Sequence, residues 1–166
     1  GQIVVDVAKG IENETFDTMT EIIEQEIPGV EAVVLSGPSH AEEVARNIPT
    51  VVVVGAKKFK VALKVQNLFA NKVFRTYISP DRKSIELGGS LKNVIALAAG
   101  IIDGLGFGDN TEAALITRGI KEITQLGVEM GGTPHFKMIF AYLKGIADWR
   151  PNSPEIHHKT QSRRSR

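Results

Sequence analysis

Short apolar runs alternate with helical periodicity in the first half of the chain. The runs that predict strands are residues 3–7, 32–35, 50–54 and 74–78. The third run has four consecutive valines, at residues 51–54, which is typical of a strand covered on both faces. Apolar residues at helical spacing predict helices over 15–26, with Phe16 on the apolar face, and over 57–69, with Leu63 and Leu68 among the apolar contacts. Such an alternation of strands and helices is typical of an α/β sheet.

The stretch from residue 86 to 105 has the clearest helical pattern. Its apolar residues recur at steps of four, three and one: Leu87, Leu91, Val94, Ile95, Ala98, Ile101, Ile102 and Leu105. A second stripe consists of small residues and one lysine: Gly88, Lys92, Ala96, Ala99 and Asp103. Small residues allow close approach, so Lys92 is expected in a shallow trough, although most helix lysines are simply exposed. Two glycines one turn upstream favour a functional interpretation, because glycine in a helix costs roughly 1 kcal/mol relative to alanine.

A last helix is predicted to run to about Met130, capped by Asn110 or Thr111 and ended by two glycines. From residue 81 onward the pattern is therefore helical only. We expect an α/β part at residues 1–81, a helical part at 82–148 and an irregular basic tail at 149–166.

Composition and charge narrow the class of protein. The chain has 166 residues, 42% hydrophobic and 23% charged, which is typical of a globular domain. A net charge of +1 implies no strong electrostatic attraction to nucleic acid or to a membrane surface. The absence of cysteine excludes disulfides and thiolate metal sites and is compatible with a cytoplasmic location. No uninterrupted apolar run approaches the roughly 18 residues of a membrane span. The histidines lack metal-ligand spacing, so no metal site is expected: His40, His135, His157 and His158.

Three short segments are candidates for chemistry. Lys9 follows the first strand, where open α/β sheets bind ligands, although an exposed loop lysine is the commoner case. The loop 36–39 precedes a helix whose first N–H groups could hold an anion, with Ser39 as the expected N-cap and Glu42 completing a capping box; a plain turn explains the loop equally well. The glycines of 104–108 lack the lysine and spacing of a phosphate-binding P-loop.

Taken together, four segments resemble bacterial NAD(P)-dependent glycerol-3-phosphate dehydrogenase. They are Ala8-Lys-Gly-Ile-Glu12, Leu35-Ser-Gly-Pro-Ser-His-Ala-Glu-Glu43, Glu86-Leu-Gly-Gly-Ser-Leu-Lys-Asn-Val-Ile-Ala96 and Gly104-Leu-Gly-Phe-Gly-Asp-Asn-Thr-Glu-Ala-Ala-Leu-Ile-Thr-Arg-Gly119. Their order and spacing match over about residues 3–132. The resemblance implies the C-terminal part of a Rossmann-like dinucleotide-binding domain at 1–81 and a helical substrate domain at 82–148.

The resemblance also implies a reaction and site residues. Hydride passes between NAD or NADP and C2 of the substrate, interconverting dihydroxyacetone phosphate and glycerol 3-phosphate for glycerophospholipid synthesis. Lys92 is implied as the proton donor and acceptor, and partial desolvation would lower its pKa toward neutrality. Lys9 is implied to contact both cofactor and substrate. The other implied contacts are Gly37, Ser39 and Asp148 to the substrate and Ala41 to the dinucleotide.

Two departures from the family pattern stand out. The family's opening Gly-x-Gly-x-x-Gly segment does not occur in this sequence, so the chain is expected to begin inside the Rossmann domain. The family's later Gly-x-Gly-Asp-Leu segment is matched only weakly at 145–148, and its Ser-Arg-Asn-Arg segment is not matched. A truncated or frame-disrupted copy would show this loss of pattern after Pro134.

Two further readings stay open. In one, the chain is a catalytically inactive fragment that binds a partner or a complementary chain; its edge strand at 3–7 would favour oligomers. In the other, it is a related two-domain dehydrogenase acting on another substrate, which would require the Leu-Gly-Gly-Ser-Leu-Lys-Asn motif at 87–93 and the Gly-Phe-Gly-Asp-Asn loop at 106–110 to recur together. The choice between NAD and NADP and the formation of a homodimer also stay open.

Overall fold

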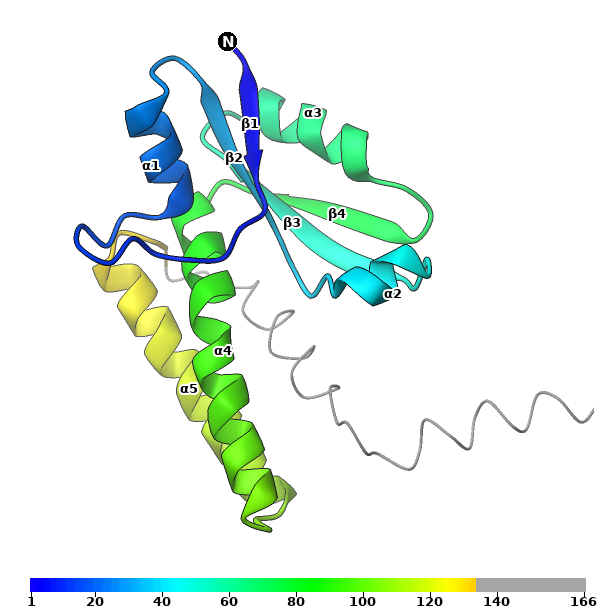
Figure 1. Ribbon diagram of the computed structural model, residues 1–166, viewed down its shortest axis with the longest axis vertical. Helices are drawn as coiled ribbons and strands as arrows, with labels where there is room; N and C mark the ends of the chain where they lie inside the picture. The colour runs from blue at the N-terminus through cyan, green and yellow to red at the C-terminus, as the bar shows by residue number, and fades with distance from the viewer. Residues whose placement is uncertain (134–166) are drawn as a thin grey trace, which may run out of the picture.

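The computed structural model describes residues 1–133, and in them four strands form one sheet (Figure 1). The strands are β1 (Ile3–Asp6), β2 (Glu31–Ser36), β3 (Thr50–Ala56) and β4 (Phe74–Ser79), in the order β1-β2-β3-β4. β1 pairs with β2 and β3 with β4 in parallel, whereas β2 and β3 are antiparallel, so the sheet is mixed. All four predicted strands are confirmed, and β1 lies at an edge.

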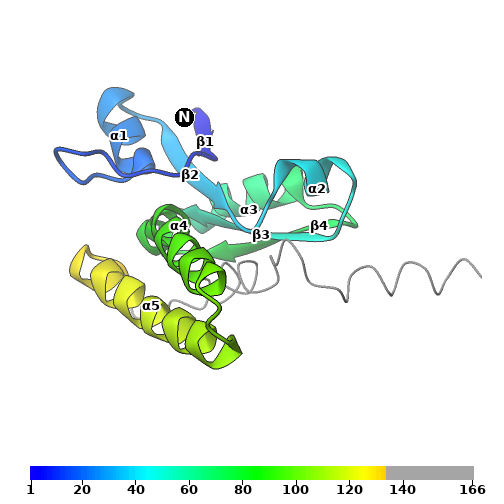
Figure 2. The same ribbon diagram turned by 60° about the horizontal axis from the view of Figure 1, so that its bottom comes forward.

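Three helices belong to the sheet region and two follow it. They are α1 (Met19–Glu26), α2 (Ala41–Ala45) and α3 (Phe59–Phe69), then α4 (Arg82–Gly104) and α5 (Asp109–Glu129). The last two lie side by side and extend away from the sheet (Figures 1 and 2). The expected α/β region followed by an all-helical region is thus confirmed. β4 ends at Ser79 and α4 begins at Arg82, while the domain limits at 81 and 148 stay a prediction.

The two central strands bury side chains on both faces, as the apolar run of β3 predicts. On one face, Val52 and Val54 of β3 pack with Val33 and Leu35 of β2 and with α3. On the other face, Val34 and Val53 pack with Ile85 in the first turn of α4. A Cβ at Gly55 would lie 2.6 Å from Ile85 Cδ1, so glycine there permits α4 to approach the sheet closely. The sheet therefore fixes the N-terminal end of α4.

The helical pair has a smaller core of its own. Ile95 of α4 and Ile123 of α5 are buried together, and Gly119 of α5 leaves room for the Ile95 side chain. Several residues of the predicted apolar face of α4 are nevertheless exposed: Val94, Leu97, Ile101 and Leu105. By length and mean hydropathy α4 also meets the criterion for a membrane-spanning helix, although it contains no uninterrupted apolar run of that length. The core helix of a globular protein meets the same criterion, and the first turns of α4 are buried against the sheet.

Helix starts differ from the sequence-based expectations for local reasons. α1 begins at Met19 rather than residue 15, because Thr18 and Glu21 form a capping box there. Phe16 was expected on the apolar face and is instead 63% exposed, in a turn at φ 60°. α5 begins at Asp109 with Gly108 as its N-cap, so the predicted caps at residues 110 and 111 were wrong.

The predicted apolar contacts of α3 are only partly right. Val65 and Ala62 are buried against the sheet, as helical spacing requires. Leu68 is 76% exposed, and Leu63 is also exposed, so both predictions of a core contact were wrong. The reason is that α3 packs against the sheet along one face only, and its apolar stripe is wider than that face.

An ion-pair network joins α1 to the start of α4. The Arg82 guanidinium donates to both oxygens of Glu24, at 2.8 and 2.9 Å, and to the Ala32 carbonyl oxygen at 3.1 Å. Lys57 also donates to Glu24, at 2.7 Å. The hydrogen bond from Arg82 holds the pKa of Glu24 at about 2, below its ordinary 4.5, although burial opposes this. The network therefore depends on an ionised Glu24.

This network predicts a specific loss of stability in acid. A carboxyl whose pKa is lower in the folded chain stabilises fully above its unfolded pKa and loses that contribution as the pH falls through its folded pKa. For Glu24 the window runs from about 4.5 down to about 2. Glu24→Gln should flatten the dependence of the unfolding free energy on pH across this window, measured by urea unfolding. The matched control, Glu26→Gln at an exposed position of α1, should keep the slope of the original chain.

Candidate functional site

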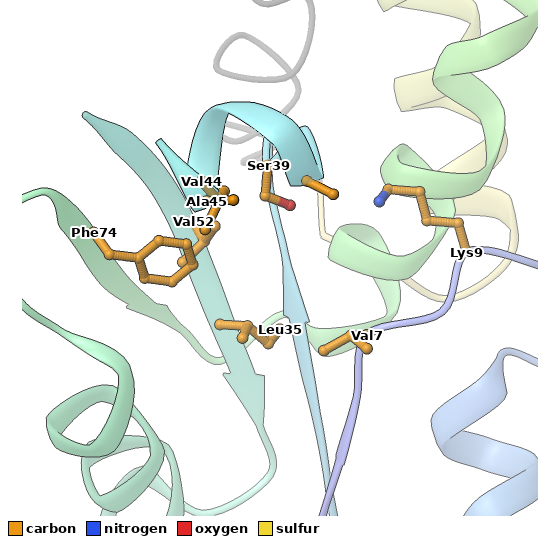
Figure 3. A pocket seen from close by; sticks show the side chains of 9 residues that line it. Val7, Lys9, Leu35, Ser39, Val44, Ala45, Val52 and Phe74 are labelled. Carbon is orange, nitrogen blue, oxygen red and sulfur yellow. The ribbon is translucent and has the colours of Figure 1, made fainter. Parts of the chain in front are cut away.

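A cavity opens at the edge of the sheet where β1 and β2 end (Figure 3). Its volume is about 380 Å³, and its wall is formed by Val7, Lys9, Leu35, Ser39, Ala41, Val44, Ala45, Val52 and Phe74. Most of these side chains are aliphatic or aromatic, and Lys9 and Ser39 supply the polar groups. The carboxyl ends of parallel strands are the usual ligand-binding edge of an α/β sheet. The position predicted from the sequence is thus where the cavity lies.

Lys9 reaches the cavity from the loop that follows β1. In Figure 3 its ammonium group points across the opening toward the Ser39 side. The loop starts from a fixed point, because Asp6 Oδ1 accepts the Ala8 N–H at 3.0 Å. The second carboxylate oxygen of Asp6 is buried with no hydrogen-bond partner among the described residues. Burial raises the pKa of Asp6, while the Ala8 N–H and the charge of Lys9 oppose that rise.

The loop between β2 and α2 forms the opposite wall. Gly37 is buried, and a Cβ there would lie 2.6 Å from the Val51 carbonyl oxygen and 2.8 Å from Val52 Cα. The prediction that Ser39 is the N-cap of α2 was wrong, because His40 takes that position. The predicted capping box with Glu42 is also absent. The Ser39 hydroxyl instead donates back to the Gly37 carbonyl oxygen at 3.3 Å. The chain therefore closes on itself before α2, which places Ser39 and the first residue of α2 on the cavity.

The tight fit at Gly37 predicts a cost for any side chain. Gly37→Ala should destabilise the chain by about 1–3 kcal/mol, because the new methyl meets the backbone of β3 and either strand must shift. Gly100→Ala is the matched control: it lies within α4 with nothing in reach of its Cβ, so it should be neutral or stabilising. Unfolding midpoints in urea measure both. Equal midpoints for the two variants would contradict the close approach of β2 and β3 at this point.

Lys92 lies on α4, half-buried and outside the wall of the cavity. Burial lowers its pKa, and the positive charge of Lys9 lowers it further. Two lysines 83 positions apart in the sequence are thus electrostatic neighbours in the fold. The small-residue stripe is buried at Gly88 and Ala99, whereas Asp103 is exposed, so the predicted trough is present only along part of the helix.

The described residues contain most of the predicted site but not all of it. Lys9, Ser39 and Ala41 line one cavity, Gly37 supports its wall, and Lys92 is coupled to Lys9. Asp148 lies outside the described residues, as do three of the histidines. Within residues 1–133, no group of three or more histidine, aspartate or glutamate side chains could hold a metal ion.

Sequence reasoning missed two kinds of site residue. Val44 and Phe74 line the cavity, but nothing in an apolar residue on a helix or at the start of a strand distinguishes a cavity wall from a core contact. Glu86 is buried within the motif around Lys92. In the sequence, Glu86 is an acidic residue directly before an apolar residue of the helix, which does not by itself indicate a buried carboxylate. Its burial is explained only by its hydrogen-bond partner on α1, Thr20.

Comparison with protein families matches both parts of the chain to one family. Residues 1–62 match the NAD-dependent glycerol-3-phosphate dehydrogenase N-terminus, and residues 81–151 match the C-terminus of the same family. The chain belongs to this family. The C-terminal match continues past residue 132, where the resemblance in order and spacing was expected to end, and includes Asp148. The expected loss of family pattern after Pro134 is therefore wrong as far as residue 151.

Curated relatives agree with the family. The chain is 63% identical over 148 residues to "Glycerol-3-phosphate dehydrogenase [NAD(P)+]" of Agathobacter rectalis, covering 89% of this chain and 43% of the relative. It is 54% identical over 162 residues to the protein of the same name from Fusobacterium nucleatum, covering 96% and 48%. The chain thus spans about half the length of the curated relatives that it matches.

Solved structures share the fold. The glycerol-3-phosphate dehydrogenase of Coxiella burnetii superposes with a TM-score of 0.79 at 30% identity, covering 94% of this chain and 53% of that one. The Plasmodium falciparum glycerol-3-phosphate dehydrogenase superposes with a TM-score of 0.82 at 23% identity, covering 90% and 44%, which supports the fold alone.

Proposed function

We propose that this chain carries the two-lysine part of the active site of an NAD(P)-dependent glycerol-3-phosphate dehydrogenase, interconverting dihydroxyacetone phosphate and sn-glycerol 3-phosphate. The observation that carries the proposal is the coupling of Lys9, on the wall of the cavity, to a half-buried Lys92 with a lowered pKa. Membership of the family supports the same reaction. A cytoplasmic location and a role in glycerophospholipid synthesis belong to this proposal.

The cavity fits the reacting end of a dinucleotide. Its aliphatic and aromatic wall suits a flat ring, and Lys9 with the first residue of α2, Ala41, would contact it from two sides. When bound, NAD or NADP supplies the acceptor or donor of hydride at C2 of the substrate. This sequence does not contain the Gly-x-Gly-x-x-Gly motif that holds a pyrophosphate. The proposed binding in this cavity therefore concerns only the nicotinamide end of the dinucleotide.

Lys92 is assigned the proton transfer at the C2 oxygen. In the oxidation of glycerol 3-phosphate, hydride leaves C2 and the neutral amine of Lys92 accepts the hydroxyl proton. In the reverse direction its ammonium form donates that proton. A lysine of ordinary pKa would be almost entirely protonated near neutral pH, and burial together with the charge of Lys9 lowers the pKa of Lys92, which is the direction that this role requires.

Lys9, Gly37 and Ser39 are assigned to the substrate. The ammonium group of Lys9 would stabilise the negative charge of a phosphate or of the developing C2 alkoxide. Ser39 offers a hydroxyl on the same wall, and Gly37 keeps the loop close to β3. The assignment of Asp148 rests on the resemblance, since it lies outside the described residues.

A spectrophotometric assay tests the proposal. The purified chain is mixed with NADH or NADPH and dihydroxyacetone phosphate, and loss of reduced-cofactor absorbance is followed. Dihydroxyacetone and pyruvate serve as comparison substrates, because a site built around Lys9 should require the phosphate. Turnover of dihydroxyacetone phosphate alone supports the proposal. Faster turnover of another 2-oxo compound would favour a related dehydrogenase, and no turnover with no cofactor binding would favour a binding or assembly module.

A further inference from the structure

A buried carboxylate between α1 and α4 takes no part in the proposed chemistry. Glu86 is only 5% exposed, and its two oxygens accept the backbone N–H of Thr20 at 2.8 Å and the Thr20 hydroxyl at 2.5 Å. Thr20 itself is completely buried. Removing a carboxylate from water is costly, and burial raises the pKa of Glu86; the two donors of Thr20 and the nearby charge of Arg82 oppose that rise only in part. Glu86 therefore joins the start of α1 firmly to α4.

This contact is continuous with the loop that carries Lys9. Thr18, the N-cap of α1, pairs through its backbone with Ile11 in an isolated antiparallel bridge. The turn between them is closed, because Glu12 Oε2 accepts the Thr15 N–H at 2.6 Å. Lys9 lies two positions before Ile11. Because Ile11 is paired with Thr18, the position of the first turn of α1, which Glu86 helps to fix, also constrains the backbone next to Lys9.

The other end of the loop is attached to the sheet, so Lys9 is held between two fixed points. Asp6 at the end of β1 accepts the Ala8 N–H, as described above. In Figure 1 the loop leaves β1, crosses the N-terminal end of α4 in this view and turns into α1. Arg82 and Lys83 of α4 also pair with Glu24 and Glu21 of α1, so α1 would stay attached without Glu86. Loss of the contact between Glu86 and Thr20 would loosen the first turn of α1, and the loop that carries Lys9 would then be held less closely beside α4.

We propose that Glu86 is a positioning residue that, through Thr20, holds the Lys9 loop on α4 and so keeps Lys9 beside Lys92. The inference rests on the proposed function for the importance of that pair, but the placement itself can be measured without turnover. A purely structural role would instead make Glu86 a source of stability that leaves the two lysines where they are.

The test is an NMR titration of Lys92 in the full 166-residue chain with isotope-labelled lysine, the Lys92 signal being assigned by its absence in Lys92→Arg. Thr20→Val removes one donor to Glu86 without changing any charge, and Thr20→Ser retains it. We expect the pKa of Lys92 to rise in Thr20→Val, because Lys9 is no longer held near it, and to stay unchanged in Thr20→Ser. Glu86→Gln is the second variant. Loss of its negative charge alone would lower the pKa of Lys92, so a rise there reports movement of Lys9.

A double-variant cycle separates the outcomes. Lys9→Met should raise the pKa of Lys92, and adding Thr20→Val to it should have no further effect, because the group that moved is gone. If Lys9→Met raises the pKa of Lys92 but neither Thr20→Val nor Glu86→Gln raises it, the positioning role is overturned while the proposed site stands. If Lys9→Met itself leaves Lys92 unchanged, the two lysines are not neighbours, and the proposed function loses its main support.

Discussion

Replacing Lys92 with alanine is expected to reduce the turnover of dihydroxyacetone phosphate by about 10²–10⁴-fold, the usual range for removing a general acid–base group. The affinity for NADH should stay nearly unchanged, because Lys92 lies outside the wall of the cavity. Turnover is measured from the absorbance of the reduced cofactor, and binding from NADH fluorescence. The separation of the two effects is what distinguishes a proton-transfer role from a role in folding or cofactor binding.

Two controls define the role of the amine. Lys92→Arg keeps the positive charge but cannot release a proton near neutral pH, so it should be almost as inactive as the alanine variant. Lys121→Ala, at an exposed position on α5, should retain full turnover. Substantial activity in Lys92→Arg would show that charge, and not proton transfer, is what this position contributes. A matching loss of NADH affinity in Lys92→Ala would remove the basis for the assignment.

Replacing Arg82 with methionine is expected to lower the free energy of unfolding by about 3–5 kcal/mol, the range for removing one partner of a buried ion pair. The Arg82 side chain is only 9% exposed, and its removal leaves the Glu24 carboxylate and the Ala32 carbonyl oxygen without their shared donor. The hydrophobic stem of methionine fills a similar volume, so the loss reports the charge and its hydrogen bonds. Urea unfolding followed by circular dichroism measures the change.

The comparison variant for this prediction is Arg118→Met. Arg118 also pairs with a glutamate, Glu122, but both side chains are mostly exposed on α5. Exposed pairs four residues apart contribute only about 0.3–0.5 kcal/mol, so this variant should be nearly as stable as the original chain. If Arg82→Met were equally mild, the ion pair would not be what attaches α1 to α4.

The sheet could be predicted from the sequence because its signal is local. β3 is apolar at consecutive positions because Val52 and Val54 face α3 while Val53 faces α4. Such a run can be recognised from the sequence alone. The antiparallel pairing of β2 with β3 was not predicted, because strand direction depends on where the connection through the short helix α2 returns the chain. Periodicity carries no information on that.

The helix boundaries and the site show a similar division. Three of the four motifs contain Lys9, the 36–41 loop and Lys92, and the fold brings these segments to one region. The start of α1 was placed too early because Phe16 has the right spacing for a helix, whereas the capping box at Thr18 decides where the helix begins. Glu86 was quoted in a motif but given no role, since its partner Thr20 is 66 positions away.

The central claim is that this chain supports hydride transfer to C2 of dihydroxyacetone phosphate, with Lys92 supplying the proton. The most direct measurement is an incubation of the chain with dihydroxyacetone phosphate and NADH deuterated at both C4 positions, followed by mass spectrometry of the product. The account predicts glycerol 3-phosphate that carries one deuterium at C2, formed by the original chain and not by Lys92→Ala. Product without the label, or equal labelled product from both chains, would contradict it.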